Sequence, residues 1–279
     1  MAGHAGQWIE LQGIAMYEFN YHRPTSLDEV RQLLGDNDEA KLLAGGMTLL
    51  PTMKMRLASP SDLVDLSGID ELADLSDSGD SIEIGAMVRH AEVAASDAVR
   101  SAIPALADLA DSIGDAQVRN RGTIGGSIAN SDPAADYPAA VLGLNAVVKT
   151  DRREIAADDY FLALFETALE PGEIVLSVSF PKPQRAAYSK FPNPASRYAV
   201  VGVMVVDTGA GIRVAVTGAA GCAFRATAME QALTEDFSAK ALEGIAVVDD
   251  EFNSDLHASA EYRAHLVGVM ARRAVIAIA

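Results

Sequence analysis

The sequence predicts a protein of mixed helices and strands in two domains, and three observations support this. Helix-like stretches with capping residues alternate with short apolar runs of strand length. The pattern changes near Pro181, beyond which proline-rich stretches precede two apolar runs, residues 198–207 and 212–220. A predicted strand also runs twice into a Gly-Gly pair, near Gly45 and near Gly125. With 279 residues, 49% of them hydrophobic, the chain is long enough to bury two cores.

The first domain is predicted to contain a helix in the stretch RPTSLDEVRQLLGD. Thr25 or Ser26 can cap its first turn, its apolar residues recur at helical spacing, and Gly35 ends it. Thr48 can likewise cap a short helix in LPTMKMRLA. The other predicted elements are strands at 40–46, 62–67 and 146–149, a hairpin around 78–80, helices from about 90, at 102–114 and at 136–144, and a second glycine-rich loop before the last of these helices.

The second domain is predicted to contain the strands at 198–207 and 212–220, joined by a turn, and then helices to the end of the chain. Its opening segment, KFPNPASRY, is rich in proline. We expect the prolines to hold Lys190 and Tyr198 in fixed positions without a helix or a strand.

Composition excludes several classes of function. Lys and Arg number 22 and Asp and Glu number 39, so the net charge is −17, which disfavours binding to nucleic acid or to an anionic membrane. The single cysteine, Cys222, cannot form an intrachain disulfide, an iron–sulfur cluster or a zinc site of several thiolates. No apolar stretch is long enough to span a membrane, and the start lacks the pattern of a secretory signal. We therefore expect a soluble, cytoplasmic protein, with residues 1–15 as an N-terminal extension.

The two glycine pairs suggest a binding function. Glycine lets backbone N–H groups approach a ligand closely, and successive N–H groups form a concave anion site. Two such loops facing each other would hold a diphosphate by local dipoles, against the negative charge of the whole chain. Neither loop matches the dinucleotide fingerprint or the P-loop, and ordinary tight turns are the alternative for either loop alone. Each pair has a threonine nearby: Gly45 and Gly46 have Thr48, and Gly125 and Gly126 have Thr123.

Two long motifs, LAGGMTLLPTMKMRLASPSDLVDLSGI and QVRNRGTIGGSIANSDPAADYPAAVLGLNA, resemble the FAD-binding medium subunit of molybdenum hydroxylases. This family contains the medium chains of aerobic carbon monoxide dehydrogenase and the flavin domain of xanthine dehydrogenase. The resemblance runs from Tyr17 over nearly the whole chain and includes YEFNYHRPTSLDEVRQLL and YSKFPNPASRYAVVGV. It implies an α+β fold: a vanillyl-alcohol-oxidase-like FAD-binding domain at 16–180, with subdomains at about 16–70 and 71–180, then a smaller α+β domain of the CO dehydrogenase flavoprotein type at 181–279.

The resemblance also implies that FAD lies extended between these parts, with its diphosphate on the two glycine loops. Asn130 and Asp136 match positions that hydrogen-bond the cofactor, Leu176 an apolar position on the flavin side, and Lys190 and Tyr198 positions near the isoalloxazine. No residue is expected to be catalytic by itself or to bind a metal. The expected cofactor residues are Ala44, Gly45, Gly46, Met47, Thr48, Thr123, Ile124, Gly125, Gly126, Ser127, Asn130, Asp136, Leu176, Lys190 and Tyr198.

Two residues depart from the family pattern. Met47 stands where relatives often carry a polar residue, which would leave this loop to bind by its backbone alone. Arg197 precedes Tyr198 where an acidic residue is common, which changes the expected charge near the flavin.

Other candidate residues are more ordinary. Lys54 and Arg56 could contact a phosphate of FAD or a partner subunit, or could simply be solvated. Cys222 is expected in the core, and Asp132 beside Pro133 is expected to form a turn rather than a catalytic pair with Asp136. The histidines show no metal-ligand spacing, and we expect surface or helix-end roles for them; they are His4, His22, His90, His257 and His265.

The predicted function is therefore that of an FAD-carrying electron-transfer subunit of a molybdenum hydroxylase. The resemblance implies a large molybdopterin subunit and a small [2Fe–2S] subunit as partners, assembled as a dimer of heterotrimers. The alternatives are a stand-alone FAD oxidoreductase and a non-enzymatic FAD-binding scaffold. The substrate of the complex (carbon monoxide, an aldehyde, a purine or an N-heterocycle) and the electron acceptor are left open.

Overall fold

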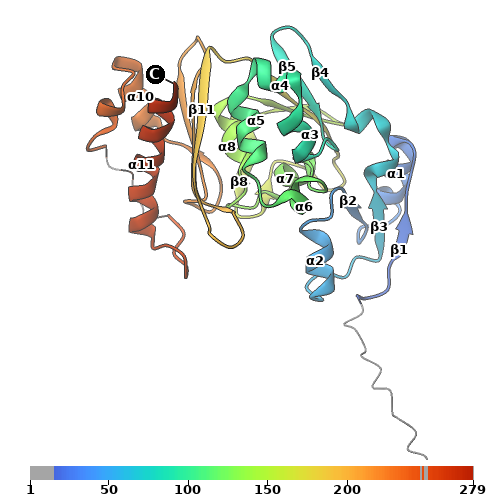
Figure 1. The fold of residues 1–279 in the computed structure, drawn as a ribbon. Helices are drawn as coiled ribbons and strands as arrows, with labels where there is room; N and C mark the ends of the chain where they lie inside the picture. The colour runs from blue at the N-terminus through green and yellow to red at the C-terminus, as the bar shows by residue number, and fades with distance from the viewer. Residues whose placement is uncertain (1–15, 246, 248–250, 279) are drawn as a thin grey trace, which may run out of the picture.

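A computed structural model of the protein describes residues 16–245, 247 and 251–278. The expected extension at residues 1–15, with His4, lies outside the described residues. The three larger of the four sheets in the described residues follow one another along the chain. They mark three groups of elements, which Figure 1 colours from blue through green to red.

The first group is a three-stranded parallel sheet of order β1-β3-β2 with two helices. The Ser26 side chain accepts a hydrogen bond from the Glu29 N–H, which confirms the predicted cap of the first helix. Val30 on that helix and Val64 on the central strand are fully buried in a small core. The elements are β1 (Asn20–His22), α1 (Leu27–Gly35), β2 (Lys41–Leu43), α2 (Leu49–Lys54) and β3 (Asp62–Asp65), followed by 3-10 turns at Leu66–Gly68 and Asp70–Ala73.

The second group is a five-stranded antiparallel sheet of order β4-β5-β10-β6-β7. Its strands are β4 (Leu75–Asp77), β5 (Ser81–Gly85), β6 (Val147–Thr150), β7 (Glu154–Ala156) and β10 (Val175–Pro181). Its helices are α3 (His90–Ala95), α4 (Asp97–Ala102), α5 (Pro104–Asp111), α6 (Ala116–Arg119), α7 (Ile124–Asn130), α8 (Tyr137–Gly143) and α9 (Ala157–Tyr160), and a small hairpin adds β8 (Phe161–Ala163) and β9 (Glu166–Thr167). The predicted hairpin between β4 and β5 and the helix that begins at His90 are confirmed.

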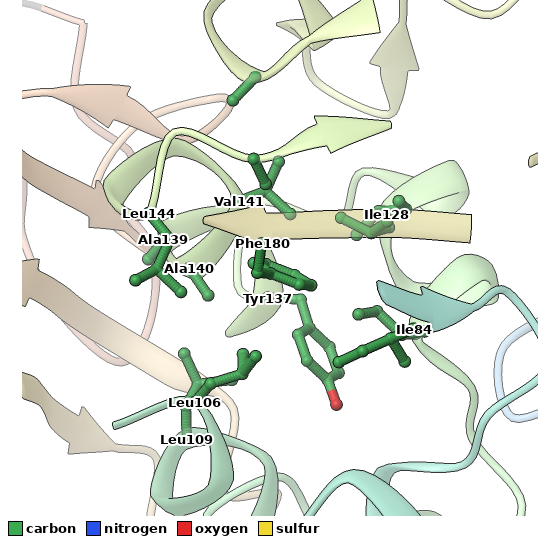
Figure 2. Packing of buried hydrophobic residues seen from close by; sticks show 14 of the residues in the cluster. Ile84, Leu106, Leu109, Ile128, Tyr137, Ala139, Ala140, Val141, Leu144 and Phe180 are labelled. Atoms are coloured by element: carbon green, nitrogen blue, oxygen red, sulfur yellow. The ribbon is translucent and has the colours of Figure 1, made fainter. Parts of the chain in front are cut away.

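The core of the second group lies between its sheet and its helices. Figure 2 shows Ile84 of β5, Phe180 of β10, Leu106 of α5 and Tyr137 of α8 meeting there, and all four are fully buried. This core fixes the positions of α7 and α8, which carry the second glycine motif and the residues that follow it.

The prediction of a second glycine-rich loop was wrong for Gly125 and Gly126. Both lie in the first turn of α7, and the Thr123 side chain caps this helix by accepting a hydrogen bond from the Gly126 N–H at 3.2 Å. Glycine lowers helix propensity by about 1 kcal/mol, which is why the sequence suggested a loop. The cap and the burial of Ile124 and Ile128 in the core stabilise the helix instead.

The third group is a four-stranded antiparallel sheet of order β11-β12-β13-β14, with a shorter helix, α10, and a long one, α11. In β12, Met204 and Val206 belong to the core of the second group, whereas Val203 and Val205 belong to a separate core beneath α11. Helices therefore cover both faces of this sheet, which explains the continuous apolar run. The elements are β11 (Arg185–Pro192), β12 (Ala199–Asp207), β13 (Ile212–Thr217), β14 (Phe224–Arg225), α10 (Thr227–Glu235), a 3-10 turn at Ala239–Leu242 and α11 (Ala260–Ile278).

One prediction about the start of this sheet was wrong. Lys190 does not lie in an irregular proline-rich segment, because β11 continues through it to Pro192. Its position is fixed by pairing with Gly202 of β12. Tyr198 lies in the loop that follows, one residue before β12, so it is outside the strand predicted at 198–207.

Candidate functional site

A cleft of about 540 Å³ lies where the three groups of elements meet. Residues 41–49 of the first group form one wall, residues 122–136 of the second group form another, and residues 196–198 of the third group lie at one end. This volume is within the range of about 300–1,000 Å³ that is usual for small-molecule and cofactor sites. The predicted residues that line it are Ala44, Gly45, Gly46, Met47, Thr48, Thr123, Gly125, Gly126, Ser127, Asn130, Asp136 and Tyr198.

Three of the predicted residues do not line this cleft. Ile124 is fully buried in the core of the second group. Leu176 packs against the small core of the first group and lines a separate hollow with Glu83 and Lys149. Lys190 is buried behind the cleft wall, where it pairs with Asp136. As cofactor contacts, these three residues stay predictions.

The first glycine loop presents unpaired backbone donors to the cleft. Among the described residues, the N–H groups of Gly45, Gly46, Met47 and Thr48 have no hydrogen-bond partner. Gly46 adopts a φ of +73°, a left-handed conformation that glycine tolerates best. Thr48 stands at the N-cap position of α2, but its side chain makes no capping bond, contrary to the sequence prediction. Four successive donors and a spare hydroxyl at a cleft form a ready anion site.

The bare backbone of this loop also serves packing. A Cβ on Gly45 would collide with the carbonyl oxygen of Arg121, and a Cβ on Gly125 would collide with Ala86. A Cβ on Gly126 would lie 3.4 Å from the Cβ of Ala44. The two glycine motifs therefore lie against each other, and their glycines permit close approach within the protein as well as toward a ligand.

The second motif offers side chains rather than backbone donors. The N–H of Ile124 donates to Val88 O at 3.1 Å, and the N–H of Gly125 donates to Ala86 O at 2.9 Å. With the Gly126 N–H donating to Thr123, the first turn of α7 has no spare backbone donor, so the expectation of two equivalent N–H loops was wrong. The side chains of Ser127 and Asn130 line the cleft and have no partner among the described residues.

Asp136 is a buried charged residue of the cleft wall. Its carboxylate accepts hydrogen bonds from the Tyr188 hydroxyl at 2.6 Å and from Lys190 Nζ at 3.0 Å. Burial raises the pKa of Asp136, and the Lys190 ammonium and the Tyr188 hydroxyl oppose that rise. A carboxylate has about four acceptor positions, so Asp136 can still accept a hydroxyl of a ligand.

His90 was not predicted as a site residue, although it lines the cleft. Its ring is 5% exposed, packs against Tyr137 at 5.3 Å between ring centroids, and leaves Nδ1 without a partner. Burial lowers the pKa of His90 to about 4, and the Arg119 charge adds to this, so the ring is neutral at physiological pH. Its neighbours in sequence gave no signal, because only the fold brings Gly122 and Tyr137 against the ring.

The end of the cleft is formed by a constrained loop. The buried Asn193 side chain accepts hydrogen bonds from the N–H groups of Ala195 and Ser196. Arg197 is held at a φ of +61°, and its guanidinium donates to Gly114 O at 3.4 Å, across to the second group. Arg197 and Tyr198 both line the cleft, so the basic residue that departs from the family pattern faces the site.

Of the remaining candidates, Asp132 lines the cleft, and the others do not. Lys54 and Arg56 do not line the cleft, and the Arg56 guanidinium lies 5.3 Å from the centre of the Tyr17 ring. Asp132 accepts a hydrogen bond from the Ala134 N–H, which confirms turn chemistry there. Cys222 packs against the core, and burial raises the pKa of its thiol. Across the described residues, no group of three or more His, Cys, Asp or Glu could hold a metal ion. None of the described helices combines the length and the hydropathy that a membrane span requires.

The chain matches two family models that together cover almost all of it. Residues 17–183 match the FAD binding domain in molybdopterin dehydrogenase, and residues 186–278 match the CO dehydrogenase flavoprotein C-terminal domain. The chain belongs to the FAD-binding medium subunits of molybdenum hydroxylases.

Similar proteins of known function support this assignment to the medium-subunit family. The chain is 36% identical to the nicotine 6-hydroxylase medium subunit of Paenarthrobacter nicotinovorans, over 92% of this chain and 95% of the relative. It is also 36% identical to the carbon monoxide dehydrogenase medium chain of Hydrogenophaga pseudoflava, over 92% of this chain and 96% of the relative. A solved carbon monoxide dehydrogenase from Hydrogenophaga pseudoflava matches with a TM-score of 0.86 at 37% identity, over 94% of this chain and 98% of that chain. The resemblance inferred from the sequence motifs is confirmed.

The residues of the cleft fit FAD, the cofactor of this family. Its diphosphate needs several donors close together, and the unpaired N–H groups from Gly45 to Thr48 supply them. Its hydroxyl groups need side-chain partners, and Ser127, Asn130 and Asp136 are available on the same wall. The hydrogen-bonding groups of the cleft therefore agree with an extended dinucleotide. In the molybdenum hydroxylase complexes of this family, the Mo and Fe–S cofactors are carried by other subunits.

Proposed function

We propose that the chain binds one FAD in this cleft, with the diphosphate on the loop from Gly45 to Thr48. The four unpaired N–H groups of that loop are the observation that carries the proposal. Ser127 and Asn130 would hydrogen-bond the diphosphate and the sugar alcohols from the opposite wall, and Asp136 would accept a ribose or ribityl hydroxyl. Tyr198 and Arg197, at the end of the cleft, would border the isoalloxazine.

We further propose that the chain acts as an electron-transfer subunit within a larger complex. When bound, FAD supplies the redox chemistry, by which electrons from partner [2Fe–2S] clusters pass to an external acceptor. The chain has one cysteine and cannot hold such clusters itself, so a small iron–sulfur subunit and a large molybdopterin subunit would be its partners. A dimer of such heterotrimers, and a cytoplasmic location, stay predictions from the sequence.

FAD binding is tested on the purified chain with one variant and one matched control. Wild-type chain reconstituted with FAD should bind one FAD per chain. Gly46→Ala should weaken FAD binding at least about tenfold, because a Cβ at φ +73° is strained and would meet Leu50. Gly79→Ala is the control, since Gly79 also has positive φ, at +87°, but meets no atom within 4 Å and does not line the cleft. A wild-type chain that takes up no FAD contradicts the proposal.

The place of the chain in a complex is tested by isolating it from its native cells under mild conditions. Molybdopterin and iron–sulfur subunits should co-purify in equal amounts, and substrate should then reduce the bound FAD. A chain that purifies alone and oxidises a substrate by itself would be a stand-alone oxidoreductase. A chain whose FAD no donor reduces would be a scaffold.

A further inference from the structure

A buried polar cluster joins the C-terminal sheet to the wall of the cleft. Asp136 accepts hydrogen bonds from Tyr188 and Lys190, both on β11, and Lys190 Nζ also donates to Ser112 O at 3.0 Å. The Lys190 and Asp136 side chains are only 7% and 3% exposed. Of these residues, Asp136 alone lines the cleft. At this point the C-terminal domain does not line the cleft itself, and it contacts the cleft wall only through the Asp136 carboxylate.

The neighbouring strand is adapted to this cluster. Gly202 interrupts the valine-rich run of β12 and pairs in register with Lys190. A Cβ at Gly202 would collide with the Tyr188 hydroxyl. Glycine weakens the interior of a strand, so its presence here indicates a close approach. The space it leaves is the space that the Tyr188 hydroxyl occupies when it donates to Asp136.

We propose that Lys190 and Tyr188 are positioning residues that keep Asp136 ionised and oriented in the cleft wall, so that the C-terminal domain supports FAD binding through Asp136. This inference rests on the proposed binding of FAD in the cleft. Two of the three ammonium donors of Lys190 are used within the protein, and its side chain does not line the cleft. The effect of Lys190 on the cofactor therefore passes through the carboxylate, rather than through contact with the isoalloxazine.

The charges around Asp136 determine what the loss of Lys190 would do. Lys190 and Tyr188 face the carboxylate from β11, Tyr137 follows it in α8, and Tyr198 and Asp132 lie near it along the cleft. Lys190 is the only cation among these groups. Without it, burial favours the protonated acid. A protonated acid accepts a hydrogen bond from a hydroxyl less strongly than a carboxylate does. In a chain without Lys190, FAD binding should therefore weaken as the pH falls.

The test is a double-mutant cycle on the full chain, with FAD affinity measured by fluorescence at pH 6, 7 and 8. Lys190→Met should weaken FAD binding about tenfold or more at pH 6 and less at pH 8, because more of the Asp136 carboxylate is protonated at the lower pH. In an Asp136→Asn background, Lys190→Met should have almost no further effect and no pH dependence. Tyr188→Phe should act in the same direction, but more weakly. Lys149→Met is the control, because it removes an ion pair with Glu83 away from the cleft.

Two results would overturn the inference. If Lys190→Met weakens FAD binding equally with Asp136 or Asn at position 136, the lysine contacts the cofactor directly. If it leaves FAD binding unchanged, or strengthens it at low pH, Asp136 is not the acceptor that Lys190 maintains. Should Lys190→Met fail to fold by circular dichroism, Tyr188→Phe in the same cycle decides between these results. A wild-type chain that binds no FAD would instead refute the proposed function.

Discussion

Replacing Glu173 by glutamine is expected to destabilise the fold through a single buried carboxylate. Glu173 is 5% exposed and accepts hydrogen bonds from Thr150 Oγ1 at 2.7 Å, from Arg153 Nε and Nη2 at 3.1 Å, and from the Glu170 N–H at 2.8 Å. These bonds, those from Arg153 above all, lower the pKa of Glu173 from 4.5 to about 2. A lowering of this size is worth about 3 kcal/mol, and solvent screening at the partly exposed Arg153 reduces the expected loss to about 2 kcal/mol.

The pH dependence of this effect has a definite sign. Because the pKa of Glu173 is lower in the folded chain than in the unfolded chain, the unfolded chain binds its proton first. The stabilisation is therefore complete above about pH 5 and is lost as the pH falls from 4.5 toward 2. Wild type and Glu173→Gln should differ most near pH 7 and converge at low pH.

The assay is thermal unfolding of the FAD-saturated chain between pH 3 and pH 7. A loss of about 2 kcal/mol should lower the melting temperature by about 4–8 °C at pH 7. Glu170→Gln is the matched control, because Glu170 contacts the same Arg153, at 4.0 Å, but has a side chain that is 59% exposed. It should change the melting temperature little. A Glu173→Gln variant as stable as wild type, or a difference that grows as the pH falls, would refute the reasoning.

Three further predictions follow from other residues. Gly45→Ala should lower both stability and FAD content more than Gly126→Ala, because a Cβ at Gly45 meets backbone at Arg121; equal effects in paired unfolding and FAD titrations would contradict this. His90→Asn should flatten the dependence of the unfolding free energy on pH between pH 6.5 and about pH 4. In the wild type the unfolded chain protonates His90 in this range while the folded chain does not, which costs the fold about 3 kcal/mol. An unchanged pH profile would show that His90 is protonated in the fold. Ser26→Ala should lower the unfolding free energy by about 1 kcal/mol through loss of the α1 cap, with FAD affinity unchanged.

The sequence alone determined much of the local structure. The serine before a periodic apolar stretch predicted the beginning of α1, and the turn residues around Gly79 predicted the hairpin between β4 and β5. Such signals are local, because a cap or a turn needs only neighbouring residues. The long glycine motifs were specific enough to identify the family, and they also located the wall of the cleft.

The roles of individual site residues were decided by the tertiary structure. Gly125 lies in a helix rather than in a loop, because Thr123 and the core of the second group stabilise that turn. Lys190 faces a carboxylate 54 residues away in the sequence, and His90 enters the cleft because Gly122 and Tyr137 enclose its ring. Burial and ion pairing depend on contacts between distant segments, which no local pattern contains. The residue types expected to bind FAD could therefore be predicted from the sequence. Which of them are free to bind it depends on the hydrogen bonds and ion pairs that the folded chain already makes.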